Sequence, residues 1–280
     1  MGAEAKGLVH DGDTVIGVHA TDASGPFKIL ADLTIACDGR HSVIRTSAGL
    51  DVERRWTCSG SAPENPPKRK VSSHASRQEI MVTLDRGTYW QCAYVIPKGR
   101  YDAVKARGLE SFRSDVASLA PILKPGIADV KSWEDVKLLT VAVNRLKRWT
   151  RPGLLCIGDA AHAMSPVGGV GVNIAVQDAV AAANCLAAKF VHGTVNEHDL
   201  VEVQRRREFP MRITQAMQVI VQNNISAALK PGNGLFKPPL FARVVNAVPW
   251  LQGLTARFLA VGVRPEHVRS KEAVLSEVKS

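Results

Sequence analysis

The sequence has 280 residues, 45% of them hydrophobic, which is enough for a substantial buried core in one large domain or two closely associated ones. Its net charge of +10 does not indicate a nucleic-acid binder, because half of the excess comes from the single segment 54–78 rather than from a basic groove. It contains neither a long uninterrupted apolar run nor a signal-peptide pattern, so we expect a cytoplasmic protein without a membrane span. The five scattered cysteines form no C-x-x-C pair and are expected to be reduced, mostly buried thiols.

The first part of the chain is predicted to be β-structure. Strands are expected at 14–18, at 27–30 and at 31–37, the last of them buried and ending at Asp38-Gly39. The segment 54–78 is rich in proline and basic residues and follows no period, which predicts an irregular loop.

The rest of the chain alternates strands and helices. Its predicted elements are a hairpin of strands 79–84 and 89–96, an amphipathic helix at 103–123, strands at 136–146 and 154–157, and helices at 174–191 and 197–225. We expect the last helix to be kinked or broken near Pro210, and the charged end of the tail at 231–280 to fray.

The strongest chemical signal lies between the predicted strand at 154–157 and the helix that follows. Gly158-Asp159 comes directly after the strand and leads into a glycine-rich stretch. A strand, a glycine loop and a helix form a phosphate-binding geometry, because glycine lets the backbone approach a ligand and the N–H groups at a helix start favour an anion or an electron-rich carbonyl. A carboxylate placed like that of Asp159 can accept hydrogen bonds from a ribose or ribityl hydroxyl.

This stretch resembles the second FAD fingerprint of the flavoprotein aromatic hydroxylases, the para-hydroxybenzoate hydroxylase-like monooxygenases. The resemblance implies that Asp159 contacts the ribityl chain, that Pro166 lies near the flavin ring, and that the backbone up to Asn173 faces the pyrimidine edge of the isoalloxazine. The residues expected to bind the cofactor here are Gly158, Asp159, Pro166, Gly168, Gly169, Val170, Gly171, Val172 and Asn173.

A second stretch, residues 37–45, resembles the Asp-Gly motif of the same family. It carries Asp38, Gly39, Ser42 and Arg45 in the family's order. The resemblance implies that Asp38 and Gly39 lie close to FAD and help to hold the pyrophosphate of NADPH, and that Arg45 supports the turn. NADPH or NADH is the electron donor that the family implies.

Less specific interpretations of these residues remain open. His162 has no evident carboxylate partner in the sequence and is expected to pack and hydrogen bond rather than act as a base. Asp38, His41 and Ser42 could suggest a catalytic triad, but proximity in sequence says little about triad geometry. Asp159 could instead cap the following turn. No catalytic side chain can be named.

The resemblance implies an α/β fold in which a glutathione-reductase-like, Rossmann-type FAD-binding domain is incomplete. The expected divisions are residues 1–50 and 151–192 for the FAD-binding domain, 51–150 for a β-sheet substrate domain and 193–280 for a helical carboxyl-terminal region. Family members begin with a G-x-G-x-x-G unit that is not found here, so we expect about 110 to 130 residues to be absent relative to such an enzyme.

The irregular segment has a related hypothesis. Similar proteins read close to Ala-Pro-Met-Asp-Val-Leu-Trp-Phe-Arg after the Asp-Gly motif, and codons for that peptide read from the second base give the string found at 54–62. The segment would then be out-of-frame translation, with a strand of the substrate domain lost and the frame restored before Ile80. Resequencing the gene tests this, and the same peptide in a clean reading frame of close relatives would contradict it.

The resemblance therefore implies an FAD-dependent, NAD(P)H-dependent monooxygenase that hydroxylates a small, possibly aromatic substrate. Three alternatives stay open: an inactive flavoprotein fragment, a flavin reductase or dehydrogenase of the same fold, and a basic nucleic-acid binder supported by charge alone. We expect a small-molecule substrate, no nucleic-acid partner and a possible homodimer.

Overall fold

The computed structural model describes residues 2–62, 72–76, 79–96, 99–166, 169–193, 195–228, 248, 250–253, 257 and 261–269, with the backbone alone for 54–62, 72–76, 79, 139–142 and 224–228. The chain divides into two compact units. The first comprises residues 1–54, 143–217 and 253–280, and the second comprises 55–142 and 218–252. The domain boundaries expected from the sequence stay a prediction.

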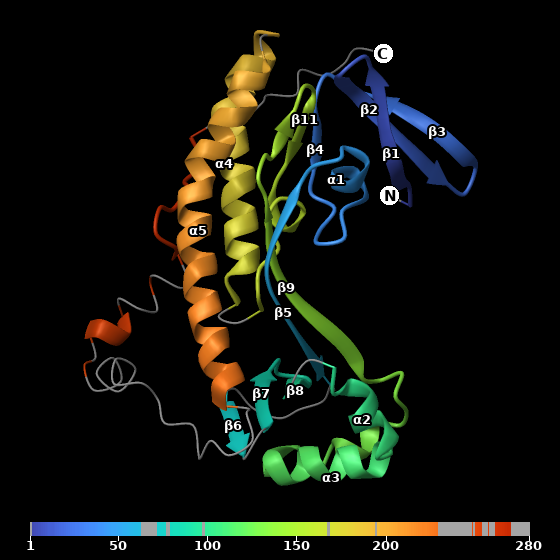
Figure 1. The fold of residues 1–280 in the computed structure, drawn as a ribbon, viewed down its shortest axis with the longest axis vertical. Helices are drawn as coiled ribbons and strands as arrows, with labels where there is room; N and C mark the ends of the chain where they lie inside the picture. Colours follow the sequence, from blue (N-terminus) through green and yellow to red (C-terminus); the bar gives the residue numbers. More distant parts are fainter. Residues whose placement is uncertain are drawn as a thin grey trace. The chain divides into compact units, whose positions relative to one another are not determined.

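An antiparallel meander opens the first unit (Figure 1). It consists of β1 (Glu4–Asp11), β2 (Thr14–Asp22) and β3 (Gly25–Leu30) in that order. The strands predicted at 14–18 and 27–30 are confirmed, and β1 adds a strand that the sequence analysis did not specify. Leu8 and Val15 point into the core of the unit, so one face of the meander is buried.

A small sheet brings together segments far apart in the sequence. It consists of β10 (Thr150–Arg151), β11 (Leu154–Cys156) and β4 (Thr34–Ala36) in that order. β4 and β11 run parallel, with Ala36 opposite Cys156, and the Ile157 amide extends the pairing to the Ala36 carbonyl at 3.0 Å. Both predicted strands are present, but the prediction that the first of them is buried is wrong: β4 is three residues long, Ile35 is 42% exposed and Cys37 is exposed. The carboxyl ends of the two strands meet at one edge of the sheet.

Two antiparallel helices cover this core. α4 (Gly171–Val191) and α5 (Glu197–Ala228) lie against each other, as the bonds from Arg207 to Asp178 and from Lys189 to Asp199 require. α5 continues through Pro210, so a break there is wrong, and the alternative of a kink stays a prediction. Leu200, Val203 and Met211 of α5 pack in the core, and tertiary packing of this kind stabilises a helix against the roughly 3 kcal/mol that an interior proline costs.

Among the described residues, α4 is the one helix long and apolar enough to cross a membrane by length and composition. Its middle carries the fully buried Asp178, and Ile174, Ala181 and Leu186 pack in the core of the first unit. A buried, paired carboxylate and an apolar face directed into the protein are typical of a core helix.

The second unit contains most of a five-stranded sheet. In spatial order its strands are β6 (Ser72–Ser76), β7 (Glu79–Asp85), β8 (Trp90–Ile96), β5 (Val52–Ala62) and β9 (Lys137–Leu146). The hairpin and the strand predicted at 136–146 are confirmed.

The loop predicted at 54–78 is wrong where the structure describes it. Residues 54–62 belong to β5 and 72–76 form β6, so a strand is present where the frame hypothesis expected one to be lost; residues 63–71 and 77–78 lie outside the described part. β5 pairs with β8, with Ser59 opposite Ile96 and Ser61 opposite Tyr94. β8 alternates buried and half-buried residues, and pairing with so well-patterned a strand overrides weak local propensity.

The amphipathic helix predicted at 103–123 is divided in the structure. It consists of α2 (Tyr101–Ala106), α3 (Leu109–Leu119) and a 3₁₀ turn, η1 (Pro121–Leu123), which another such turn, η2 (Ile127–Asp129), follows. Gly108, the N-cap of α3, has φ +89° and ψ 160°, a conformation outside the helical region that glycine adopts readily, so one helix becomes two here. The predicted packing on a sheet is confirmed, since the ring of Phe112 packs edge to face on that of Tyr94 in β8, with 5.7 Å between the ring centroids.

Candidate functional site

Both sequence motifs lie where β4 and β11 end, and a buried arginine ties them together. Arg45, only 8% exposed, donates from Nη2 to the Arg40 carbonyl at 2.8 Å and from Nη1 to the Ala160 carbonyl at 3.0 Å. One guanidinium therefore bonds to the backbone of the Asp-Gly motif and to that of the Gly-Asp motif. Its planar set of five donors suits this bridging position better than a lysine would.

The Asp-Gly motif forms a turn that leads into a short helix, α1 (Val43–Ser47), which the sequence analysis did not predict. Gly39 has φ +84°, so the turn requires glycine. Ser42 is the N-cap, and its Oγ accepts from the Arg45 amide at 2.8 Å; Asp38 Oδ2 accepts from the Ile44 amide at 3.2 Å. Both side chains accept hydrogen bonds from backbone N–H groups at the start of α1, and this capping arrangement gives no support to a catalytic triad.

The Gly-Asp motif begins with a tight turn, η3 (Gly158–Ala160). Gly158 has φ +58°, and its carbonyl accepts from the amides of Ala161 and His162 at 2.9 and 2.8 Å. Asp159 stands between these anchored residues with 31% of its side chain exposed, and its Oδ2 lies 3.5 Å from Arg40 Nη2. Ile157, not Asp159, is the N-cap of this turn, so the capping interpretation of Asp159 is wrong.

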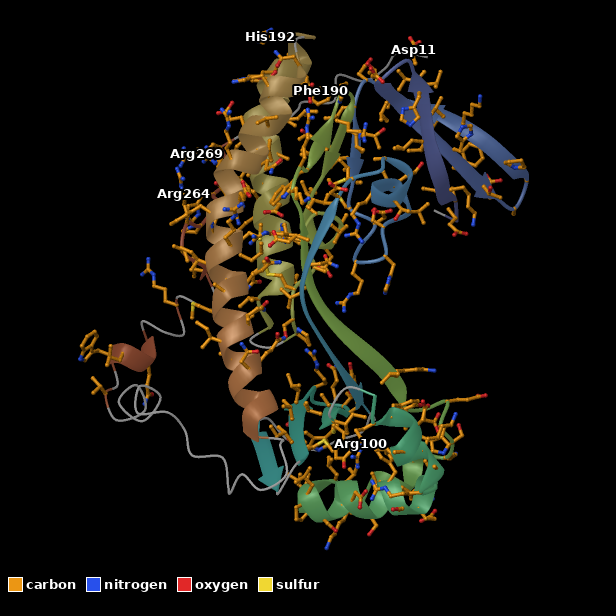
Figure 2. The ribbon with its side chains drawn as sticks, viewed as in Figure 1. Asp11, Arg100, Phe190, His192, Arg264 and Arg269 are labelled. Atoms are coloured by element: carbon orange, nitrogen blue, oxygen red, sulfur yellow. The ribbon has the colours of Figure 1, made fainter. Side chains whose placement is uncertain are left out.

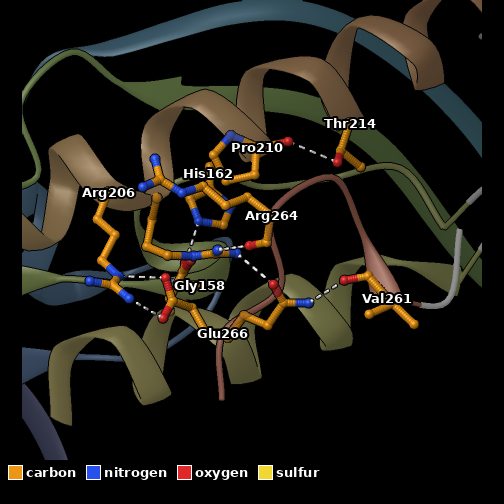
Figure 3. Close-up of polar contacts among 11 residues, drawn as sticks. Gly158, His162, Arg206, Pro210, Thr214, Val261, Arg264 and Glu266 are labelled. Carbon is orange, nitrogen blue, oxygen red and sulfur yellow. Dashed lines mark hydrogen bonds and ion pairs between the residues drawn. The ribbon is translucent and has the colours of Figure 1, made fainter. Parts of the chain in front are cut away.

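A buried cluster lies beneath the turn, and Figure 3 shows it at close range. His162 is 1% exposed, and its Nε2 lies 2.5 Å from Oδ2 of Asp178, the carboxylate partner that the sequence analysis did not find. The same oxygen accepts from the Gly158 amide at 3.1 Å, and Oδ1 accepts from Arg207 Nε at 2.9 Å. Burial by itself raises the pKa of Asp178, but His162 and Arg207 together lower it below the ordinary value for an aspartate.

The loop between the turn and α4 is only partly described. Pro166 and Gly169 are exposed, Gly169 has φ +64°, and its amide donates to the Pro166 carbonyl at 3.0 Å; Gly168 lies outside the described residues. Val170 is buried. The predicted site residues Gly171, Val172 and Asn173 form the first turn of α4.

The start of α4 is open to a ligand by its composition. Val170 is its N-cap and makes no side-chain capping bond, and none of Gly171, Val172 and Asn173 is acidic. Val172 is 72% exposed. The positive end of the helix dipole therefore has no protein anion in its first turn.

A cleft of about 740 Å³ lies at the other end of β4. Leu30 and Asp32, which precede β4, contribute to its lining together with Phe190 at the end of α4, which is labelled in Figure 2. Ligands of parallel α/β sheets bind at the carboxyl ends of the strands. This cleft is therefore separate from the edge where the two motifs meet.

Comparison with known proteins shows which proteins this chain is similar to. Residues 1–217 match the family described as FAD binding domain. The 6-methylpretetramide 4-monooxygenase of Streptomyces rimosus is 28% identical over 266 residues, which cover 89% of this chain and 63% of that protein. The 4-methyl-5-nitrocatechol 5-monooxygenase of a Burkholderia species is 26% identical over 240 residues, which cover 76% of this chain and 42% of that protein.

The fold is also that of solved hydroxylases. The OxyS anhydrotetracycline hydroxylase from Streptomyces rimosus superposes with a TM-score of 0.70 at 20% identity, covering 94% of this chain and 53% of that one. The structure of PqsL, a probable FAD-dependent monooxygenase from Pseudomonas aeruginosa, gives a TM-score of 0.63 at 20% identity, covering 81% and 64%. The chain thus spans less than two thirds of the length of each of these relatives, and over that span it has their mixed α/β fold. On the match of residues 1–217, the chain belongs to the FAD-binding-domain family.

Proposed function

We propose that the edge formed by the Asp-Gly and Gly-Asp motifs binds FAD, and that the protein is a monooxygenase that oxidises a small aromatic substrate with NADH or NADPH as electron donor. The observation that carries the proposal is the meeting of both motifs at the carboxyl ends of β4 and β11, where Arg45 bonds to each. The chain's resemblance to monooxygenases that act on aromatic compounds supports the choice of reaction.

The residues at this edge fit FAD. The half-buried carboxylate of Asp159 is exposed enough to accept a hydrogen bond from a ribityl hydroxyl, and its weak ion pair with Arg40 at 3.5 Å is easily exchanged. Among the residues that the structure describes, none beyond its chain neighbours has an atom within 4 Å of a Cβ placed at Gly169. The uncapped start of α4 suits the electron-rich carbonyl of a flavin pyrimidine edge.

When bound, FAD supplies the redox chemistry, accepting electrons from a nicotinamide and reducing oxygen. The chain's own residues orient it. Asp159 would hold the ribityl chain, and Gly171 and Val172 would present backbone N–H groups and the positive helix end to negative charge on the flavin ring. Pro166 is exposed ahead of α4, where it would be available to the cofactor. We assign no acid or base to a side chain.

Retention of flavin tests the proposal. The purified chain is incubated with FAD and desalted, and its visible absorption is compared with that of Asp159→Ala and of Asp32→Ala. Asp32 is an exposed carboxylate at the opposite end of β4, so it is the matched control. We expect the parent and Asp32→Ala to retain the flavin bands, and Asp159→Ala to bind about tenfold or more weakly, because a hydrogen bond to a charged group contributes roughly 1.5–3 kcal/mol.

The choice of reaction is tested separately. A chain that retains FAD should oxidise NADH or NADPH faster when an aromatic substrate is present and should incorporate one oxygen atom into it. Flavin retention without substrate-dependent oxygenation across a panel of phenols and polycyclic aromatics would exclude the monooxygenase reaction while leaving the FAD site intact.

A further inference from the structure

One buried carboxylate links three separate segments of the first unit. Asp178, on α4, is fully buried. Its Oδ2 accepts from the Gly158 amide at 3.1 Å and lies 2.5 Å from His162 Nε2, while its Oδ1 accepts from Arg207 Nε at 2.9 Å. Gly158 and His162 are labelled in the close-up of Figure 3.

Arg207 compensates the buried charge and is itself fixed. Besides Asp178, it donates from Nη1 to the Arg264 carbonyl at 3.1 Å and from Nη2 to Gln177 Oε1 at 3.2 Å. A buried ion pair costs desolvation free energy and is often replaceable by apolar residues without loss of stability. Stability alone therefore does not explain a charged pair at this place.

The positions of the hydrogen bonds that Asp178 accepts explain the buried charged pair better. Gly158 and His162 are the two ends of the turn that carries Asp159, and the same carboxylate oxygen holds both of them. Asp159 does not touch Asp178, yet its direction depends on how these two anchors are held. An apolar side chain at position 178 could fill the space but could not accept the Gly158 N–H.

We propose that Asp178 is a positioning residue of the flavin site: it fixes the 158–162 turn and thereby sets the direction in which Asp159 presents its carboxylate. Arg207 acts through Asp178 by holding that carboxylate in place. The part of this proposal that concerns the flavin rests on the proposed function, whereas the part that concerns the turn does not.

The test removes both charges together, so that neither is left buried alone. In the double variant Asp178→Leu with Arg207→Met no charge is left buried alone, but the Gly158 amide and His162 lose their partner, so we expect an unfolding midpoint lower than that of the parent with a cooperative transition retained. We also expect amide hydrogen exchange across 158–162 in the cofactor-free protein to become about tenfold faster, and FAD to bind about tenfold more weakly. Should this variant not fold, Asp178→Ala with Arg207→Gln makes a smaller change with the same expected losses.

Two further variants separate positioning from packing. Asp178→Asn with Arg207→Gln keeps an oxygen that can accept from Gly158, so exchange and FAD affinity should stay within about threefold of the parent. The control is Arg206→Met with Glu266→Leu, which removes a neighbouring ion pair of α5, with contacts of 2.6 and 2.9 Å, that does not touch the turn (Figure 3). Neither exchange at 158–162 nor FAD affinity should change in it.

The outcomes are distinguishable. Unchanged exchange and unchanged FAD affinity in the Leu/Met variant, or equal losses in the Arg206 control, would overturn the positioning role and leave the proposed function standing. A parent chain that binds no FAD, combined with faster exchange in the Leu/Met variant only, would contradict the proposed function and uphold the role of Asp178 in the turn.

Discussion

Replacement of Gly158 by alanine tests the geometry of the site through its backbone. Gly158 has φ +58°, and a Cβ there would lie 3.0 Å from the Cβ of Ala175 in α4. A residue other than glycine costs about 1–2 kcal/mol in the left-handed region, and forcing an extra methyl group into a packed site costs about 1–3 kcal/mol. We expect Gly158→Ala to lower the free energy of unfolding by about 2–5 kcal/mol, the sum of the two costs.

Gly12 provides a matched control. It has φ +56°, almost the same conformation, but a Cβ there would meet nothing within 4 Å. Gly12→Ala should therefore show the backbone cost alone, about 1–2 kcal/mol. Urea denaturation followed by circular dichroism measures both. If Gly158→Ala proves no more destabilising than Gly12→Ala, the close contact between the turn and α4 is refuted.

The remaining predictions concern charge and thiols. Arg40→Gln should change the free energy of unfolding by less than about 1 kcal/mol, because the ion pair it removes is about one third exposed; a loss above about 2 kcal/mol in urea titrations would contradict this. The pKa of Asp178 is lowered in the folded protein. The ionised carboxylate therefore stabilises the fold at pH values above the unfolded-state pKa of about 3.9, and this contribution is lost as the pH falls through the folded-state pKa. In acid titrations, the difference in free energy of unfolding between the parent and Asp178→Asn should shrink. In a Cys58→Ser background, a thiol reagent should label Cys37 first, because this thiol is exposed. Cys156 is buried, and burial raises its pKa to about 12, so it should be labelled only when the protein unfolds.

The half of the candidate site around Gly158-Asp159 was predicted from its local pattern and from the family resemblance, whereas the Asp-Gly half was predicted from the resemblance alone. Each half follows an apolar run of strand length and begins with the glycine and acid that such a position favours. The parallel pairing of β4 with β11 then places Asp38 and Asp159 at one edge, which is a general property of parallel strands rather than a detail of this chain.

The supporting residues could not be predicted in the same way. Asp178 is a single acid in an Ala-rich helix, and nothing in its own neighbourhood reveals that it meets His162 and Arg207 in space. The strand at 54–62 has no period of its own and forms by pairing with β8. α1 is only five residues long, and its one local signal was the N-cap Ser42. Asp178 and the strand at 54–62 depend on interactions with segments distant in sequence, and α1 is too short to show a helical period.

Titration of the ¹⁵N-labelled chain with FAD, followed by amide chemical shifts, tests the central claim most directly. If the two motifs form one flavin site, the amides of Gly39, Asp159 and Gly171 should shift together along a single saturation curve, while those of Gly12 and Asp32 stay in place. Shifts confined to the cleft near Asp32, or no shifts at saturating FAD, would contradict the proposed site.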